Sequence, residues 1–198
     1  LGDVYKRQLL TRVMTSFGTP EVAALGVGHK LEVLNYFVCA GMGAAATTLV
    51  GQNLGADDPG RAVRCAWRTL FLTCLPVGAV TILLVSFPGA AIGVFSGDPN
   101  VVAAGTTYVL LVGLTQLFMA AEVVMLGAFA GAQWTALPAA IVIGFTAVRV
   151  PFAMWLVSIG WGVEAVWFAI ASTTVVKGTI LATLFGVRYG AGEVESEE

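Results

Sequence analysis

Four long stretches without a charged residue constrain the fold of this 198-residue chain more than any other feature. They cover residues 33–56, 69–97, 99–121 and 123–148. Each is longer than the roughly 20 apolar residues that a helix needs to cross a hydrocarbon core about 30 Å thick. The stretches therefore predict an all-α polytopic membrane protein, built as a bundle of transmembrane helices.

The composition excludes other classes of protein. Charged residues make up 11% of the chain and hydrophobic residues 58%, whereas a soluble domain is about 25% charged. The formal net charge is −2, so the chain has no basic face with which to bind nucleic acid. We therefore expect membrane lipid, and no nucleic acid, among its partners.

Three similar signals predict where helices begin. Thr19-Pro20-Glu21 places a capping residue, a first-turn proline and an acid at the positive end of the helix dipole. Asp57-Asp58-Pro59 and Asp98-Pro99 repeat this pattern. About five full transmembrane helices and the tail of a sixth follow, over residues 20–53, 60–87, 100–130, 136–158 and 163–188, with the tail over 9–17.

The first of these full helices is too long for one straight crossing. We expect it to project or to bend, with Gly41 and Gly43 as the bend. Small residues in this helix and in the helix over 100–130 should let their backbones approach closely. The small residues are Gly41, Gly43, Ala44, Ala45 and Ala46, and Gly127, Ala128, Ala130 and Gly131.

The two ends of the chain differ from its middle. Residues 1–8 resemble translated sequencing-adapter sequence, so we interpret them as non-native and set them aside. Residues 9–190 form the expected transmembrane domain. Residues 191–198 contain four glutamates and are expected to form an acidic, disordered tail.

Basic residues predict the orientation in the membrane. When the helices alternate, Arg61, Arg64, Arg68 and Arg188 fall on one side, and the loops near 18–21, 88–99 and 159–163 contain no Lys or Arg. The positive-inside rule then places the Arg61–Arg68 loop and the tail in the cytoplasm of a cell with this protein in its plasma membrane. Trp161 and Trp167 lie near a helix end and are expected at the membrane interface.

The most specific pattern in the chain runs from Gly43 to Ala62. From Leu49 onward it reads L-V-G-Q-N-L-G-A-D-D-P-G-R-A, and it closely resembles the signature of the multidrug and toxic compound extrusion (MATE) family. The signature residues are Gly51, Gln52, Asn53, Gly55, Pro59 and Arg61. Four further segments are similar to motifs of that family: Phe95–Val101, Gly127–Gly131, Arg149–Pro151 and Gly162–Trp167.

The resemblance implies a secondary antiporter rather than an enzyme. MATE proteins have twelve helices in two six-helix lobes, and they export organic cations in exchange for H⁺ or Na⁺ by alternating access. The position of the Trp167 motif implies that this chain is the C-terminal lobe, so the N-terminal lobe would be its missing partner. No cofactor beyond the coupling ion is implied. Gln133-Trp134-Thr135 stands where the family often has Gly-Asp-Thr, so no role of that aspartate is transferred.

Two interpretations of the signature segment remain open. It can act as a structural connector, with glycines at a tight helix exit and Gln52 and Asn53 bonding the last carbonyls, or as a hinge between lobes. A phosphate-binding loop is excluded because no Gly-Lys-Ser/Thr follows. Three cysteines and one histidine, with no C-x-x-C pair, do not predict a metal site.

Ionisable residues inside the predicted spans are the main candidates for function, because a charge in lipid costs a few kcal/mol. Glu122 and Glu32 are the candidates for ion coupling, with Arg149, Lys177 and Lys30 as supporting charge partners. The alternative is structural ion pairing, of Glu122 with Arg149 or Lys177 and of Glu32 with Lys30. The two acids are expected at different depths, which argues against one shared site.

Soft side chains are the candidates for substrate contact, because aromatic and Met side chains adapt to varied cationic ligands. They are Tyr36, Phe37, Met42, Gln116, Phe118, Met119 and Met125. Alternative functions are a lipid-linked oligosaccharide flippase of the same superfamily, which would need a more basic cavity, and a noncatalytic membrane scaffold. A membrane enzyme would need a cluster such as H-E-x-x-H, which the sequence lacks.

Overall fold

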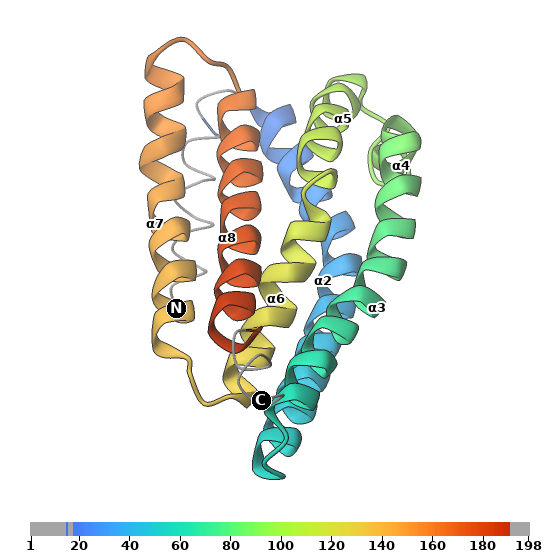
Figure 1. Ribbon diagram of the computed structural model, residues 1–198. Helices are drawn as coiled ribbons and strands as arrows, with labels where there is room; N and C mark the ends of the chain where they lie inside the picture. Colours follow the sequence, from blue (N-terminus) through green and yellow to red (C-terminus); the bar gives the residue numbers. More distant parts are fainter. Residues whose placement is uncertain (1–14, 16–17, 191–198) are drawn as a thin grey trace.

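The computed structural model describes Thr15 and residues 18–190. Three predictions concern residues outside this description. They are the non-native segment over 1–8, nearly all of the helix tail over 9–17 and the acidic tail over 191–198. Across the described ranges the chain forms helices and no strands, arranged as an elongated bundle (Figure 1). This agrees with the all-α class predicted from the uncharged stretches.

The helices begin and end close to the predicted positions. They are α2 (Thr19–Gly55), α3 (Pro59–Ser86), α4 (Pro88–Gly93), α5 (Pro99–Gly113), α6 (Gln116–Gly131), α7 (Ala136–Ser158) and α8 (Glu164–Gly190). Four of them, α2, α3, α7 and α8, are each long and apolar enough to cross a membrane. The short helix α4 was not predicted and occupies part of the expected loop over 88–99, where Pro88 occupies its first turn.

The prediction of one continuous helix over 100–130 is wrong. Helices α5 and α6 form a broken span with a bend of 50° between them. At the break, the Thr115 hydroxyl donates to the Val112 carbonyl at 2.8 Å, and the Gln116 amide donates to the same carbonyl at 3.5 Å. Side-chain bonds of this kind compete with the helical backbone ladder, which gives the interruption a local cause.

Helix α2 has 37 residues and runs unbroken through Gly41 and Gly43. At about 1.5 Å per residue its length is roughly 55 Å, well beyond a hydrocarbon core of about 30 Å. One end must therefore project from the membrane, or the helix must tilt.

The sequence predicted a capping residue at the start of three helices, α2, α3 and α5. The Asp58 carboxylate accepts from the backbone N–H of Arg61 at 2.8 Å, and Asp98 accepts from that of Asn100 at 2.9 Å. These two caps are confirmed. The third is wrong, because Thr19 is already helical and Gly18 precedes the helix without a side-chain cap.

Backbone contact between α2 and α6 depends on glycine. A methyl group at Gly127 would overlap the carbonyl oxygen of Gly43, and one at Gly131 would overlap that of Thr47. The Thr47 hydroxyl donates to the Gly127 carbonyl at 2.9 Å, so the two helices are also joined by a hydrogen bond. The predicted close approach is confirmed for these glycines, whereas Gly41 is exposed and faces open space.

Trp167 does not belong to an outward-facing aromatic belt. It is fully buried in an apolar cluster between α2, α5 and α8, with its ring 4.7 Å from that of Tyr108. The prediction failed because α8 begins at Glu164, so Trp167 falls in its first turn on the side facing the bundle. Trp161, in the connection before α8, is 43% exposed, and its position at the membrane interface stays a prediction.

The arginines gather at one end of the bundle, but not in a loop. Arg61, Arg64 and Arg68 lie in the first turns of α3. Arg188, in the last turn of α8, places its guanidinium 4.0 Å from the ring centre of Trp134, between α6 and α7. The α2–α3 and α6–α7 connections and the end of α8 therefore share the lower end in Figure 1.

Candidate functional site

A polar hollow lies among α2, the α5–α6 break, α7 and α8. Its volume is about 190 Å³. Four of the five ionisable candidates, all except Lys30, line it. The polar residues and soft side chains of its lining are Glu32, Tyr36, Thr115, Gln116, Met119, Glu122, Arg149, Thr174 and Lys177.

Glu122 and Lys177 form an ion pair in the wall of this hollow. The ammonium of Lys177 on α8 donates to the Glu122 carboxylate on α6 at 2.6 Å, and both residues are buried. Gly178 allows the approach, because a methyl group there would overlap the Phe118 carbonyl of α6. Of the two partners expected for Glu122, the structure selects Lys177.

Arg149 occupies a different position and has different partners. Its Nε donates to the Thr173 hydroxyl at 2.9 Å and its Nη2 to the Thr174 hydroxyl at 3.4 Å. These bonds tie α7 to α8 and fix the guanidinium at the edge of the hollow. The Glu122 and Glu32 carboxylates attract this guanidinium across the hollow.

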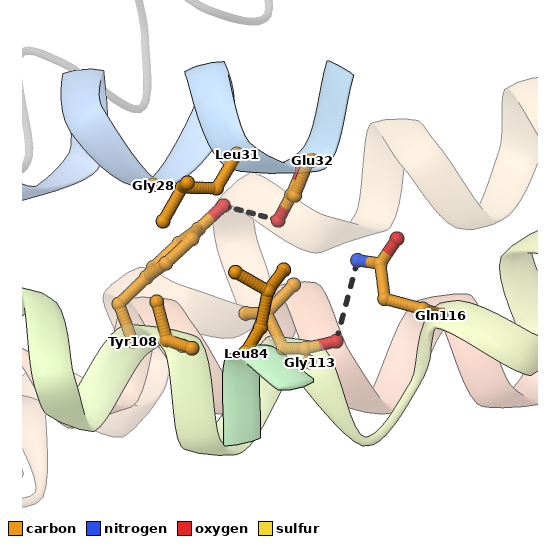
Figure 2. Close-up of a pocket in the computed structure, with 9 residues that line it drawn as sticks. Gly28, Leu31, Glu32, Leu84, Tyr108, Gly113 and Gln116 are labelled. Carbon is orange, nitrogen blue, oxygen red and sulfur yellow. Dashed lines mark hydrogen bonds between the residues drawn. The ribbon is translucent and has the colours of Figure 1, made fainter. Parts of the chain in front are cut away.

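Glu32 accepts a hydrogen bond from the Tyr108 hydroxyl of α5 at 2.5 Å (Figure 2). The tyrosine ring crosses α2 at Gly28, where a methyl group would overlap it. The same ring makes a T-shaped contact with the buried Trp167, and its centre lies 6.1 Å from that of the His29 ring. Glu32 is therefore held by an aromatic cluster that reaches from the bundle core to the hollow.

Lys30 does not provide the ion pair expected for Glu32. It is exposed, and its ammonium lies 5.8 Å from the ring centre of Phe95. Two residues apart on a helix, Lys30 and Glu32 point to different faces, which is the physical reason for the difference.

Glu32 and Glu122 line the same hollow, contrary to the expectation that their depths would separate them. The depth argument assumed a straight helix over 100–130. The bend of 50° between α5 and α6 changes the path of that span, and α2 is long enough to place Glu32 beside it. One polar site with two carboxylates is the result.

Sequence reasoning missed four polar residues that support the site. Asn35 is 1% exposed and its amide donates to the Gln116 side chain at 3.4 Å. Tyr108, Thr173 and Thr174 hold Glu32 and Arg149 as described above. Asn35 lies one helical turn after Glu32, so its polar side chain within an apolar span was an available signal.

Only some of the candidate substrate contacts line the hollow. Tyr36, Gln116 and Met119 line the hollow. Phe37 and Phe118 are exposed, at 69% and 38%. Met125 is fully buried in the apolar cluster between α2, α3, α6 and α8, and Met42 packs against that cluster.

The signature segment ends α2 and starts α3. The Asn53 amide donates to the Leu49 carbonyl at 2.7 Å and contacts the Cys65 sulfur of α3 at 3.7 Å. Asp57 adopts a left-handed backbone with φ of 55°, which reverses the chain between the two helices. This geometry accounts for a tight connector, and the hinge interpretation remains a prediction.

Comparison with known proteins identifies the family. The MatE family model matches residues 7–155, which is most of the chain. The chain belongs to the MatE family. MatE proteins are transporters, so the membrane-spanning helix bundle belongs to a transporter family. This agrees with the resemblance seen in residues 43–62.

Curated MATE relatives are longer than this chain. A probable multidrug resistance protein NorM from Thermotoga maritima is 25% identical over 179 residues, which cover 89% of this chain and 39% of the relative. The human multidrug and toxin extrusion protein 1 is 28% identical over 160 residues, covering 80% and 28%. The chain thus spans about two-fifths or less of these relatives.

Solved structures agree on the fold. The outward-facing conformation of a multidrug resistance MATE family transporter of the MOP superfamily superposes with a TM-score of 0.82 at 15% identity, over 94% of this chain and 42% of that one. A MOP superfamily transporter from Pyrococcus furiosus superposes with a TM-score of 0.83 at 15% identity, over 95% and 42%. The bundle of α2–α8 therefore has the architecture of one part of a MATE transporter.

Proposed function

We propose that this chain is the C-terminal lobe of a secondary antiporter that exports organic cations in exchange for H⁺ or Na⁺. The observation that carries the proposal is the hollow in which two carboxylates, Glu32 and Glu122, lie among helices long enough to span a membrane. Placing charged groups at such a position in a membrane costs free energy. The binding of ions and organic cations during transport would give these charges a functional role.

The ion pair supplies a coupling mechanism. A proton or Na⁺ that binds Glu122 competes with the ammonium of Lys177, which contacts the same carboxylate. Ion binding would therefore release α8 from α6 at this point, and ion loss would restore the contact. A change in contacts between two states is what an ion must produce in order to drive alternating access.

The hollow also provides for an organic cation. The Glu32 carboxylate supplies negative charge, and Tyr36 and Met119 supply adaptable apolar surface beside it. In the complete transporter the missing N-terminal lobe would close this surface from the other side. The arginine end of the bundle, with Arg61, Arg64, Arg68 and Arg188, would face the cytoplasm of a cell that carries the protein in its plasma membrane.

Reconstitution of the complete two-lobe transporter in liposomes tests the proposal. An imposed H⁺ or Na⁺ gradient is expected to drive a fluorescent organic cation across the bilayer, and an ionophore that collapses the gradient should stop it. Movement of a lipid-linked oligosaccharide without any gradient would instead support the flippase alternative. Failure of both gradients to move any organic cation would reject the antiporter.

A further inference from the structure

The first turns of α3 carry a row of arginines on the outer surface of the bundle. Arg61, Arg64 and Arg68 are all exposed, and side chains spaced by three and four residues lie on one side of an α-helix. We call this row the arginine face. Helix α3 contains no aspartate or glutamate. Asp57 and Asp58 precede it, and the Asp58 carboxylate caps the backbone N–H of Arg61, so the face keeps a net positive charge.

The same side of α3 becomes apolar directly after the arginine face. It is then formed by five side chains that are each more than half exposed, Phe71, Leu72, Leu75, Ile82 and Leu83. At about 1.5 Å per residue, the helix rises roughly 18 Å from Phe71 to Leu83. One leaflet of a hydrocarbon core about 30 Å thick is about 15 Å deep. The apolar part of α3 is therefore long enough to line the acyl chains of one leaflet.

Trp67 lies at the boundary between the charged and the apolar part. It is 38% exposed, and its ring makes a T-shaped contact with that of the buried Phe185 on α8, with 6.4 Å between the ring centres. This contact fixes the indole beside Arg68 in the sequence. Tryptophan side chains are enriched where the headgroups of a bilayer meet its acyl chains. The arginine face therefore falls at the depth of the headgroups.

The position of α3 in the bundle favours lipid over protein as the partner of this face. Helix α3 lies at the outer edge of the bundle (Figure 1). The described residues that line the polar hollow come from α2, α5, the α5–α6 break, α6, α7 and α8. A second lobe that closes the hollow would lie over these helices rather than over the outer side of α3.

We propose that the arginine face binds the headgroup of an anionic phospholipid, whose acyl chains lie along Phe71, Leu72 and Leu75. Guanidinium groups form charge-assisted and often bidentate hydrogen bonds with phosphate oxygens. A zwitterionic phospholipid also offers a phosphate, but its choline cation is repelled by the neighbouring arginines. The face therefore selects the net negative charge of the lipid. The proposal concerns a surface outside the hollow and does not depend on the antiporter mechanism.

Native mass spectrometry of lipid binding tests the proposal. The purified complete transporter is titrated in detergent with phosphatidylglycerol or with phosphatidylcholine of identical acyl chains, and the dissociation constant of each lipid is measured. The wild-type protein is expected to bind phosphatidylglycerol about tenfold more tightly. Soluble glycerol phosphate at the same concentration should not displace this lipid, because it lacks the acyl chains that contact α3. Displacement would indicate a site for free phosphate groups and would contradict a lipid site.

Variants locate the preference on α3. The double variant Arg61→Gln with Arg68→Gln should bind phosphatidylglycerol about tenfold more weakly and phosphatidylcholine within about twofold of wild type. Its retained phosphatidylcholine binding also reports that the variant is folded. Arg188→Gln is the control, because it removes an exposed arginine at the same end of the bundle. That guanidinium lies 4.0 Å from the ring centre of Trp134, and the variant should retain the preference.

Two results with these proteins would overturn the proposal. They are equal binding of both lipids by the wild-type protein, which needs no variant, and a loss in Arg188→Gln as large as that in the double variant, which would show that only overall charge matters.

A further variant tests whether the acidic C-terminal segment occupies the arginine face instead of lipid. It replaces Glu193, Glu195, Glu197 and Glu198 by glutamine. Its affinity for phosphatidylglycerol is expected to stay within about twofold of wild type. A gain of about tenfold or more would identify this segment as the occupant of the face and would overturn the lipid proposal.

Discussion

The buried contact between Glu122 and Lys177 carries a large desolvation cost, because both side chains are charged. Two charges buried together recover their desolvation cost only when their geometry is good, and removal of one leaves the other unpaired. The sequence predicted that both residues lie within spans, but it left the partner of Glu122 open between Arg149 and Lys177. The choice depends on how α7 and α8 pack, which no local pattern in the sequence reports.

Lys177→Met is expected to destabilise the protein by about 3–5 kcal/mol, because Glu122 then remains buried without a counter-charge. Adding Glu122→Gln should recover most of this loss, because the double variant contains no buried charge at this contact. Unfolding in detergent, followed by the intrinsic fluorescence of tryptophan, gives both values. A double variant as unstable as the sum of the two single variants would contradict the assignment of the pair.

At the scale of elements, local signals predicted most helix boundaries. Proline and aspartate at a helix start act through their nearest neighbours, so Asp58 and Asp98 could be recognised from the sequence alone. The break at Thr115 was missed because its surroundings contain neither proline nor charge, and polar residues such as Thr115 and Gln116 also occur inside continuous membrane helices. Trp167 was misplaced for a similar reason, since its burial depends on the packing of α8 against α5.

The capping difference between α2 and α3 leads to a direct comparison. Asp58→Ala removes the side-chain acceptor for the Arg61 N–H and is expected to cost about 1 kcal/mol. Thr19→Ala should cost much less, because Thr19 makes no such cap. Thermal unfolding of the two variants in the same detergent checks the order. Equal losses would show that the capping assignment is wrong.

The packing of α2 against α6 depends on Gly127. Gly127→Ala places a methyl group against the backbone oxygen of Gly43, which cannot move without the helix. We expect a loss of at least about 1–3 kcal/mol, the usual range for overpacking. Gly41 lies on α2, the helix that also contains Gly43, but it faces open space. The substitution Gly41→Ala should therefore be tolerated. The yield of monodisperse protein and its melting temperature distinguish the two, and equal tolerance would contradict this packing.

At the scale of the whole molecule, the bundle has two chemically different ends. The end with the α2–α3 and α6–α7 connections carries Arg61, Arg64, Arg68 and Arg188, while the opposite end includes the α4–α5 connection. The sequence predicted this asymmetry because it needs only alternating helices and a count of arginines. It could not predict the shared hollow, which required the bend between α5 and α6.

Cysteine labelling tests the orientation. In a version of the complete transporter whose native cysteines are replaced, a single cysteine at Gly97 should react with a membrane-impermeant maleimide added to intact cells. A single cysteine at Thr135 should react only after the cells are opened, because we propose that the arginine-rich end faces the cytoplasm. Both positions are exposed, so access to the reagent is set by the membrane. The reverse pattern would invert the proposed topology.

We propose above that the carboxylates of the hollow couple the binding of an ion to the export of a cation. The most direct measurement is gradient-driven transport of a fluorescent cation by liposomes that contain the complete transporter, with wild type compared with Glu122→Gln and Glu32→Gln. We predict that transport by at least one variant falls to the level measured without a gradient, while Glu164→Gln, an exposed acid in the first turn of α8, transports normally. Unchanged transport rate and ion dependence in both hollow variants would contradict the claim.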